Sequence, residues 1–329
     1  MNPRPWLALC LRASALVGVM LPAVLSAELV SDSSGQLYFS QQGSLMRIDD
    51  VRHQLQTVLR DISARRVLRN SQGDLMVESM QYDAKADLWR PGLWRYSPSR
   101  QATEPNARAA VDDFTYSDVA DSAGRLYFWQ GDRAHNLSRL LVRQTNGDLF
   151  LLAGNLWGAV DGIRSEAQLG QVGSMAIGPD ETVYFTDDGA IRRATRGGTV
   201  ETIARGGLLA SEAGAAATGN PLVAIAVDDR GVIFVAHRTR RQILRIAVET
   251  GEVTVIATSA PTWTPASLAW SRGALYVLET GPRGSRAVQI DARGQIVPLE
   301  APLDEPVRSR PIWLSAISAD RPALLACQD

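Results

Sequence analysis

The sequence is poor in the residue types that most catalytic motifs need. Its 329 residues include two Cys, three His and, among 34 basic residues, a single Lys at position 85. Two thiols cannot build a disulfide scaffold or a four-thiolate zinc site. A phosphate-binding Gly-Lys loop is excluded because Lys85 follows Ala84. The motifs G-x-S-x-G, H-E-x-x-H and G-x-G-x-x-G are also absent, so the common hydrolase, metalloprotease and dinucleotide signatures are missing.

An excess of charge of one sign is lacking too. The formal net charge is −1, and no block of basic residues occurs along the chain. Without a positive patch the chain has no electrostatic footprint for nucleic acid, so no nucleic-acid partner is expected. Hydrophobic residues make up 45% and charged residues 21%, which is typical of a folded globular protein rather than a disordered one.

The first 27 residues are typical of an export signal. Arg4 and Arg12 precede an apolar run of 13 residues, 13–25, which ends at the small pair Ser26-Ala27. The alternative is an uncleaved membrane anchor, but a spanning helix needs about 18 apolar residues or more. We expect a signal peptide over 1–27 and a soluble periplasmic or secreted protein, with no membrane span after signal removal. Cys327 is then the only thiol left.

A short pattern recurs about every 48 residues through the rest of the chain, a spacing typical of β-propeller blades. It consists of Gly, one residue, and an apolar, often aromatic strand start; Glu181 replaces the Gly in one copy. The six copies begin at Gly35, Gly73, Gly124, Glu181, Gly231 and Gly273. In four of them Asp or Asn lies three residues before the Gly, which is typical of a hairpin turn.

Each copy contains four short apolar segments separated by turn residues, and none has a helical period long enough for a helix. The units lie near 28–60, 65–103, 116–153, 172–204, 222–258 and 265–300. One four-stranded sheet cannot bury both of its faces, whereas six packed radially can. The sequence therefore predicts an all-β fold, a six-bladed β-propeller of four-stranded antiparallel blades over 28–300. Residues 301–329 brace or close the propeller, or begin a seventh unit.

Residues 152–204 resemble an NHL repeat, the unit of a family of mostly six-bladed propellers. The match includes Ala153-Gly154, Asp161-Gly162, Ala176-Ile177 and Val183-Tyr184-Phe185, and it is strongest over 152–258. The resemblance implies a rigid platform that binds proteins, peptides or other polymers. Related six-bladed propellers include lactonases, strictosidine-synthase-like proteins and amidating lyases, which generally use a metal at the central channel. Likeness of fold does not choose between these roles.

Polar residues directly follow the second strand of each blade, so they could form a ring at one rim of the channel. Two further acids belong with them: Asp161 in the loop entering the fourth blade, and Asp118 at the start of the third. The candidate ligand-binding set is Gln41, Asp118, Gln130, Asp161, Asp187, His237 and Glu279, with Ser79 at the equivalent position of the second blade. The alternative is that strand ends are simply polar and that Asp187 caps a turn.

Calcium and zinc are the cofactor candidates. Carboxylates and carbonyls suit Ca²⁺, and the metal set would be Asp118, Asp187, His237 and Glu279. A three-imidazole zinc site would need all three His together, but His53 is predicted on the opposite rim from His237. An Arg also recurs in the third strand of five blades, which indicates packing with its head at the surface or at a carboxylate.

Two functions follow as hypotheses. The first is an exported binding or scaffolding module for a protein, peptide or small-molecule ligand, because no complete catalytic set is present. The alternative is a metal-assisted hydrolase or lyase of the lactonase-like propeller type, which would use the four metal candidates around the channel.

Overall fold

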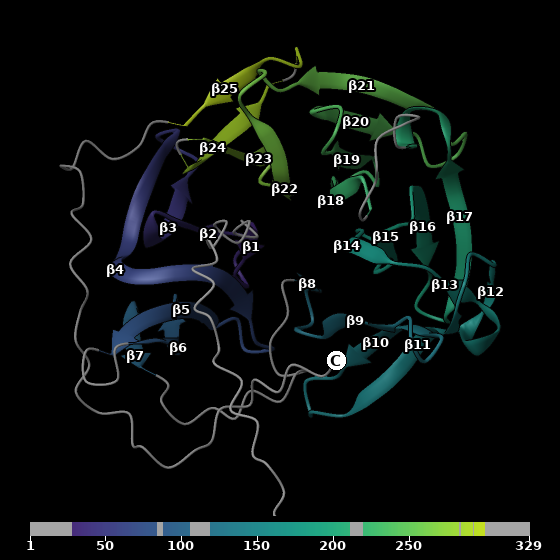
Figure 1. Ribbon diagram of the computed structural model, residues 1–329, viewed down its shortest axis with the longest axis horizontal. Helices are drawn as coiled ribbons and strands as arrows, with labels where there is room; N and C mark the ends of the chain where they lie inside the picture. Colours follow the sequence, from purple (N-terminus) through teal and green to yellow (C-terminus); the bar gives the residue numbers. More distant parts are fainter. Residues whose placement is uncertain are drawn as a thin grey trace, which may run out of the picture.

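The computed structural model describes residues 28–83, 88–105, 119–210, 220–282, 284–291 and 293–299. These residues form a β-propeller: mostly antiparallel sheets stand around a central axis, with the first strand of each four-stranded unit innermost (Figure 1). The only helical turns in these ranges are two short 3-10 turns, η1 (Arg164–Glu166) and η2 (Gly207–Leu209). No helix of the described residues is long and apolar enough to cross a membrane. The predicted signal peptide and residues 301–329 lie outside the described ranges.

The first two units share one seven-stranded sheet because a single strand serves both. β4 pairs with β3 near its start, through Leu55, and with β5 near its end, through Val67. The predicted unit bounds at 60 and 65 fall inside β4, in the stretch where its pairing passes from β3 to β5 and where Ser63 has a φ of +51°. The strands of this sheet are β1 (Val30–Ser31), β2 (Leu37–Gln41), β3 (Gly43–Asp49), β4 (Gln54–Arg69), β5 (Leu75–Asp83), β6 (Leu88–Ser97) and β7 (Ala102–Pro105).

The next two sheets each gain a fifth strand from the connection between them. β13 (Gln168–Leu169) pairs with the end of β11, and β12 (Gly162–Ile163) pairs with β17. One connecting loop thus joins two neighbouring sheets. The other strands are β8 (Val119–Ala120), β9 (Leu126–Asp132), β10 (Leu137–Arg143) and β11 (Leu149–Trp157), then β14 (Val172–Ile177), β15 (Val183–Asp187), β16 (Ala190–Ala194) and β17 (Thr199–Arg205).

The last two sheets have four strands each. Counting β4 in both units that it joins, and setting aside the added strands β12 and β13, the described strands fall into six groups of four, consistent with the six-bladed prediction. The strands are β18 (Leu222–Val227), β19 (Ile233–His237), β20 (Gln242–Ile246) and β21 (Val253–Thr258), then β22 (Thr264–Ser271), β23 (Ala274–Gly281), β24 (Gly284–Ile290) and β25 (Ile296–Pro298).

The hydrophobic core lies between neighbouring blades, because each middle strand is buried on both faces. In β15, Tyr184 belongs to the cluster shared with the following blade and Phe185 to the cluster shared with the preceding one. The ring closes in the same way: Phe39 of β2 and Leu278 of β23 share one cluster. Alternate residues of one strand therefore hold two different junctions.

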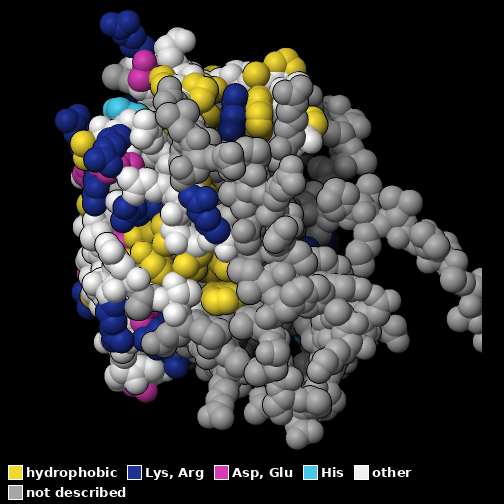
Figure 2. Space-filling model, turned by 90° about the vertical axis from the view of Figure 1, so that its left-hand side faces the viewer, with side chains coloured by type: hydrophobic (Ala, Val, Ile, Leu, Met, Phe, Trp, Pro, Cys, Tyr) yellow, Lys and Arg dark blue, Asp and Glu magenta, His cyan; other side chains and the backbone are white. Residues whose placement is uncertain are grey.

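The outer surface near β3, β4 and β7 carries scattered basic side chains. Figure 2 shows Arg side chains interleaved with acidic and hydrophobic side chains on this face rather than gathered into one patch.

Candidate functional site

The polar side chain at the end of each second strand points into the junction between two neighbouring blades. Strand alternation explains this, because Asp187 lies two residues after Phe185 and so faces the same preceding blade. One carboxylate oxygen of Asp187 accepts the Gly170 N–H at 2.8 Å. The other accepts from Arg192 at 2.6 Å, and both side chains are almost fully buried. Asp187 is thus a structural anchor for the connection between two blades.

Arg192 is the centre of this anchor, and it belongs to the stretch 152–204 that resembles an NHL repeat. Its guanidinium has 0% exposure and donates to the carbonyls of Gln168 and Val160 at 2.8 Å each, and to Asp187 and Asp161. Its carbon Cζ lies 5.9 Å from the ring of Phe185. The recurrent arginine of the third strand is its neighbour Arg193, and the sequence pattern did not predict that Arg192 would be the buried cation.

Asp161 belongs to the same anchor. Its carboxylate accepts from Arg192 at 2.9 Å, and from the backbone N–H and the hydroxyl of Thr202 at 2.9 Å each. Burial acts to raise the pKa of Asp161, but the hydrogen bonds of Thr202 and Arg192 outweigh it and the pKa is lowered. For Asp187, burial prevails over Arg192 and raises the pKa of the carboxyl. Asp161 and Asp187 therefore both pair with Arg192, but their pKa values shift in opposite directions because Asp187 is more deeply buried.

His237 is fully buried and hydrogen-bonded within its surroundings. The Arg240 N–H donates to Nδ1 at 3.3 Å, and Nε2 lies 3.2 Å from the Ala210 carbonyl oxygen. These contacts assign the neutral tautomer with the proton on Nε2. In this arrangement the imidazole joins the β19–β20 turn to the connection that follows β17.

Glu279 is also fully buried, and Arg286 neutralises it. The guanidinium of Arg286 donates to Oε2 from Nε at 2.8 Å and lies 4.2 Å from the centre of the Trp263 ring. The second oxygen, Oε1, has no hydrogen-bond partner among the described residues. The Glu279 side chain, like that of Asp187, faces a junction between blades. Each of the two acids is paired with an arginine from the neighbouring strand of its own blade.

The remaining predicted residues are likewise held by their neighbours. Gln41 donates to the Ser285 carbonyl at 2.6 Å and so links the first blade to the last. Ser79 donates to the Gly92 carbonyl at 3.1 Å, and Gln130 accepts from Arg139 at 2.7 Å. Asp118 lies outside the described residues.

The donor set of the described residues does not fit a metal. They contain no group of three or more His, Cys, Asp or Glu side chains that could hold an ion. Each of the three His has other neighbours: His53 lies 3.1 Å from Gln289, and His135 lies 2.6 Å from Asp132. Asp187, His237 and Glu279 each face a different junction, so within this part of the chain they are not brought together.

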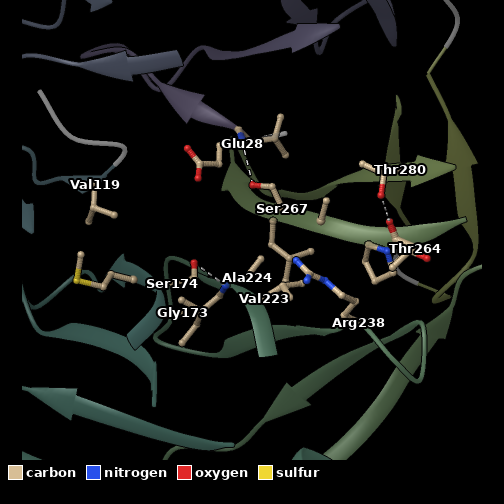
Figure 3. A pocket seen from close by; sticks show the side chains of 16 residues that line it. Glu28, Val119, Gly173, Ser174, Val223, Ala224, Arg238, Thr264, Ser267 and Thr280 are labelled. Carbon is tan, nitrogen blue, oxygen red and sulfur yellow. Dashed lines mark hydrogen bonds between the residues drawn. The ribbon is translucent and has the colours of Figure 1, made fainter. Parts of the chain in front are cut away.

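A cavity of about 480 Å³ occupies the mouth of the central channel instead. The innermost strands line it, and in Figure 3 Glu28, Ser174, Ser267 and Arg238 surround the open space. The Ser267 hydroxyl accepts the Leu29 N–H at 3.0 Å, and the Ser174 hydroxyl accepts the Ile225 N–H at 3.3 Å. These bonds join innermost strands of adjacent blades. Since each hydroxyl accepts there, its own proton stays available to a ligand.

Two charged side chains lie on the cavity wall. Glu28 is paired with Arg66 at 3.2 Å. Arg238 is exposed, follows β19 directly, and has its backbone N–H bonded to the Pro221 carbonyl at 2.9 Å. No carboxylate of the described residues pairs with its guanidinium. The mouth therefore offers hydrogen-bond donors and one cation to a molecule that enters it.

Comparison with known proteins supports the propeller fold. Residues 198–320, less than half of the chain, match the family model described as the lipoprotein LpqB beta-propeller domain. No curated protein matches this sequence. The propeller assignment is therefore confirmed, whereas membership of the NHL-repeat family stays a prediction.

Several solved structures are similar over most of their length. Virginiamycin B lyase from Staphylococcus aureus is 13% identical, with 84% of this chain and 85% of that chain covered and a TM-score of 0.46. A chain of the nidogen/laminin complex is 14% identical, with 81% of this chain and 96% of that chain covered and a TM-score of 0.49. The calcium-binding protein regucalcin from Agrobacterium tumefaciens is 14% identical, with 77% of this chain and 82% of that chain covered and a TM-score of 0.44. Identities this low carry no statement about activity.

Proposed function

We propose that this protein is an extracytoplasmic binding module that holds its ligand at the mouth of the propeller channel. The observation that carries the proposal is the mouth cavity, in which Ser174, Ser267 and Arg238 present donors while the strand-end acids are occupied elsewhere. Such a surface suits a peptide, protein segment or small molecule rich in carbonyl or carboxylate oxygens. The export pattern of residues 1–27 and the match to a lipoprotein domain support the location.

The proposal includes the finer assignments made from the sequence. These are an NHL-like propeller of six blades over 28–300, a signal peptide over 1–27 and a bracing role for 301–329. The first is supported by the six groups of four strands in the described residues. A limited proteolysis experiment on exported protein, read by mass spectrometry, tests all three boundaries. We expect a mature start after Ser26 or Ala27 and a resistant core of about 270 residues.

Affinity capture tests the binding role. The full mature chain, immobilised through an added tag, is incubated with native envelope extract and with a fraction of small metabolites. We expect specific retention of one ligand at stoichiometric amounts. A monomer that retains nothing and instead turns over a small substrate contradicts the proposal.

The metal-assisted hydrolase or lyase remains the second candidate, and one observation favours it: Glu279 keeps a buried oxygen without a partner. Elemental analysis of protein purified without chelator is the direct test. Because the described donors do not converge, we expect less than stoichiometric metal and an unchanged melting temperature on adding Ca²⁺ or Zn²⁺. Stoichiometric metal together with a raised melting temperature would favour the enzyme instead.

A further inference from the structure

The outer strand of the third blade exposes a run of apolar side chains. Leu149, Phe150 and Leu151 of β11 are 41%, 50% and 42% exposed at three consecutive positions. Figure 1 shows β11 on the outer side of its sheet. Edge strands are usually protected by charge, proline or a covering segment, because open backbone groups pair with other chains. None of these three residues is charged or proline.

The outer edge of this run is open within the described part of the chain. β11 pairs with β10 along its inner edge, and β13 meets its outer edge only at Leu156 and Trp157. Beyond Leu152 the Gly198 turn approaches closely, since a Cβ on Gly198 would lie 2.5 Å from the Leu152 carbonyl oxygen. The open segment is therefore short and has a defined end.

A second cavity, of about 290 Å³, lies directly beside this edge. Phe150, Leu151 and Leu152 form its apolar wall, and it can take one large apolar side chain. The lining also includes three arginines and one glutamate, so it has an excess of positive charge. These residues are Arg125, Arg164, Arg196 and Glu181.

The single glutamate is already shared by two of the arginines. Glu181 lies 2.9 Å from Arg125 and 3.1 Å from Arg196, and Arg125 also meets Asp121 at 2.5 Å. Arg164 has no carboxylate partner among the described residues; its Nε reaches only the Gly197 carbonyl, at 3.4 Å. An incoming carboxylate would complete this group of charges.

We propose that β11 and the neighbouring cavity form a docking site for an extended segment of a partner protein that alternates apolar and acidic residues. The segment adds a strand along Leu149–Leu151, places an apolar side chain in the cavity and sets a carboxylate on Arg164. Charge complementarity decides against a second copy of this chain, because two such arginine walls would repel each other. The site is distinct from the channel mouth and does not depend on the function proposed there.

A peptide titration tests the docking site. The probe is a fluorescein-labelled, end-blocked peptide of about eight residues, a usual strand length, that alternates Leu and Glu. Binding to the full mature chain is followed by fluorescence anisotropy, and the same peptide with Gln in place of Glu tests the charge. Variants Leu151→Asp and Arg164→Glu alter the site. Val297→Asp and Arg230→Glu are matched exposed controls on other strands and turns.

We expect saturable binding of the Glu peptide to the unaltered chain and to both controls. Leu151→Asp and Arg164→Glu should each weaken it about tenfold or more, and the Gln peptide should bind several-fold more weakly, as loss of a charged contact implies. Hydrogen exchange should slow at Leu149–Leu151 when the peptide is bound. No saturable binding, or equal binding to site variants and controls, overturns the proposal. Self-association that Leu151→Asp abolishes also overturns it, because the occupant would then be a second copy.

Discussion

Arg192 and Arg193 are adjacent residues of β16 in opposite surroundings. The Arg192 side chain is fully buried between two carboxylates and two carbonyls, whereas Arg193 is 37% exposed and pairs with Glu201 at 2.6 Å. Breaking a buried pair leaves an uncompensated charge, so Arg192→Met should lower the free energy of unfolding by about 3–5 kcal/mol. Arg193→Met should cost less than about 1 kcal/mol. Urea denaturation of both variants checks the difference; equal losses would contradict the role of Arg192.

Asp161 gives the propeller a predictable dependence on pH. The pKa of Asp161 is lower in the folded protein than its usual value of 3.8, so the carboxylate stabilises the fold above that value. This contribution is lost as the pH falls through the lowered pKa. Asp161→Asn should therefore reduce the melting temperature at pH 7, and the gap from the unaltered protein should close toward about pH 3.

The control for this experiment is Asp148→Asn, in an exposed turn where the carboxylate contacts Asn146. It should change the melting temperature little at either pH. A gap for Asp161→Asn that stays constant from neutral to acid would show that its carboxylate charge does not stabilise the fold.

Residue identity allowed the strand-end set to be found but not its direction. Asp187, His237 and Glu279 were predicted directly after second strands, whereas Asp187 and His237 are the last residues of β15 and β19 and Glu279 lies two residues before the end of β23. Alternate residues of a strand face the same side, and Phe185 and Val235, two residues before Asp187 and His237, belong to clusters at junctions between blades. The polar side chains therefore face these junctions as well. Which face of a strand packs against the neighbouring blade depends on how the blades are arranged, and that cannot be read from a single sequence.

The hairpin turns are the elements that the sequence predicted best. In the turns that end at Gly35, Gly73, Gly124 and Gly231, the glycine N–H donates to the carbonyl of the predicted Asp or Asn. The recurrent arginines also meet carboxylates in two blades, Arg95 with Asp74 and Arg193 with Glu201. Local chemistry decides both features. That one strand, β4, serves both of the first two units was not predicted, because it depends on pairing with two separate partners.

Two of these turns allow a test of how much stability depends on glycine at a left-handed position. Gly124 and Gly231 have φ of +82° and +83°, but a Cβ on Gly124 would lie 2.5 Å from the Ser71 carbonyl oxygen, whereas Gly231 has open space around it. Gly231→Ala should cost about 1–2 kcal/mol for the left-handed backbone alone. Gly124→Ala should cost more, because the turn of the preceding blade must also move. Chemical denaturation of both checks the order, and equal costs would contradict the close approach.

At the scale of the whole molecule, the 48-residue period was enough to predict a propeller, because only a radial arrangement buries both faces of each sheet. The channel mouth was beyond the reach of the sequence. Ser174, Ala224 and Ser267 are small residues at the starts of innermost strands and match no motif. They meet around one cavity only because the ring closes, so their shared location is a property of the complete fold.

The central claim is that ligands bind at this mouth, and filling the mouth tests it most directly. Ala266→Trp places a large ring in the cavity from a half-buried position, and Arg230→Glu is an exposed control in the β18–β19 turn. Both variants, with melting temperatures confirmed, are compared with the unaltered chain in quantitative capture from native envelope extract. The ligand retained by the unaltered chain and by Arg230→Glu should be lost from Ala266→Trp. Equal retention by all three would contradict binding at the channel mouth.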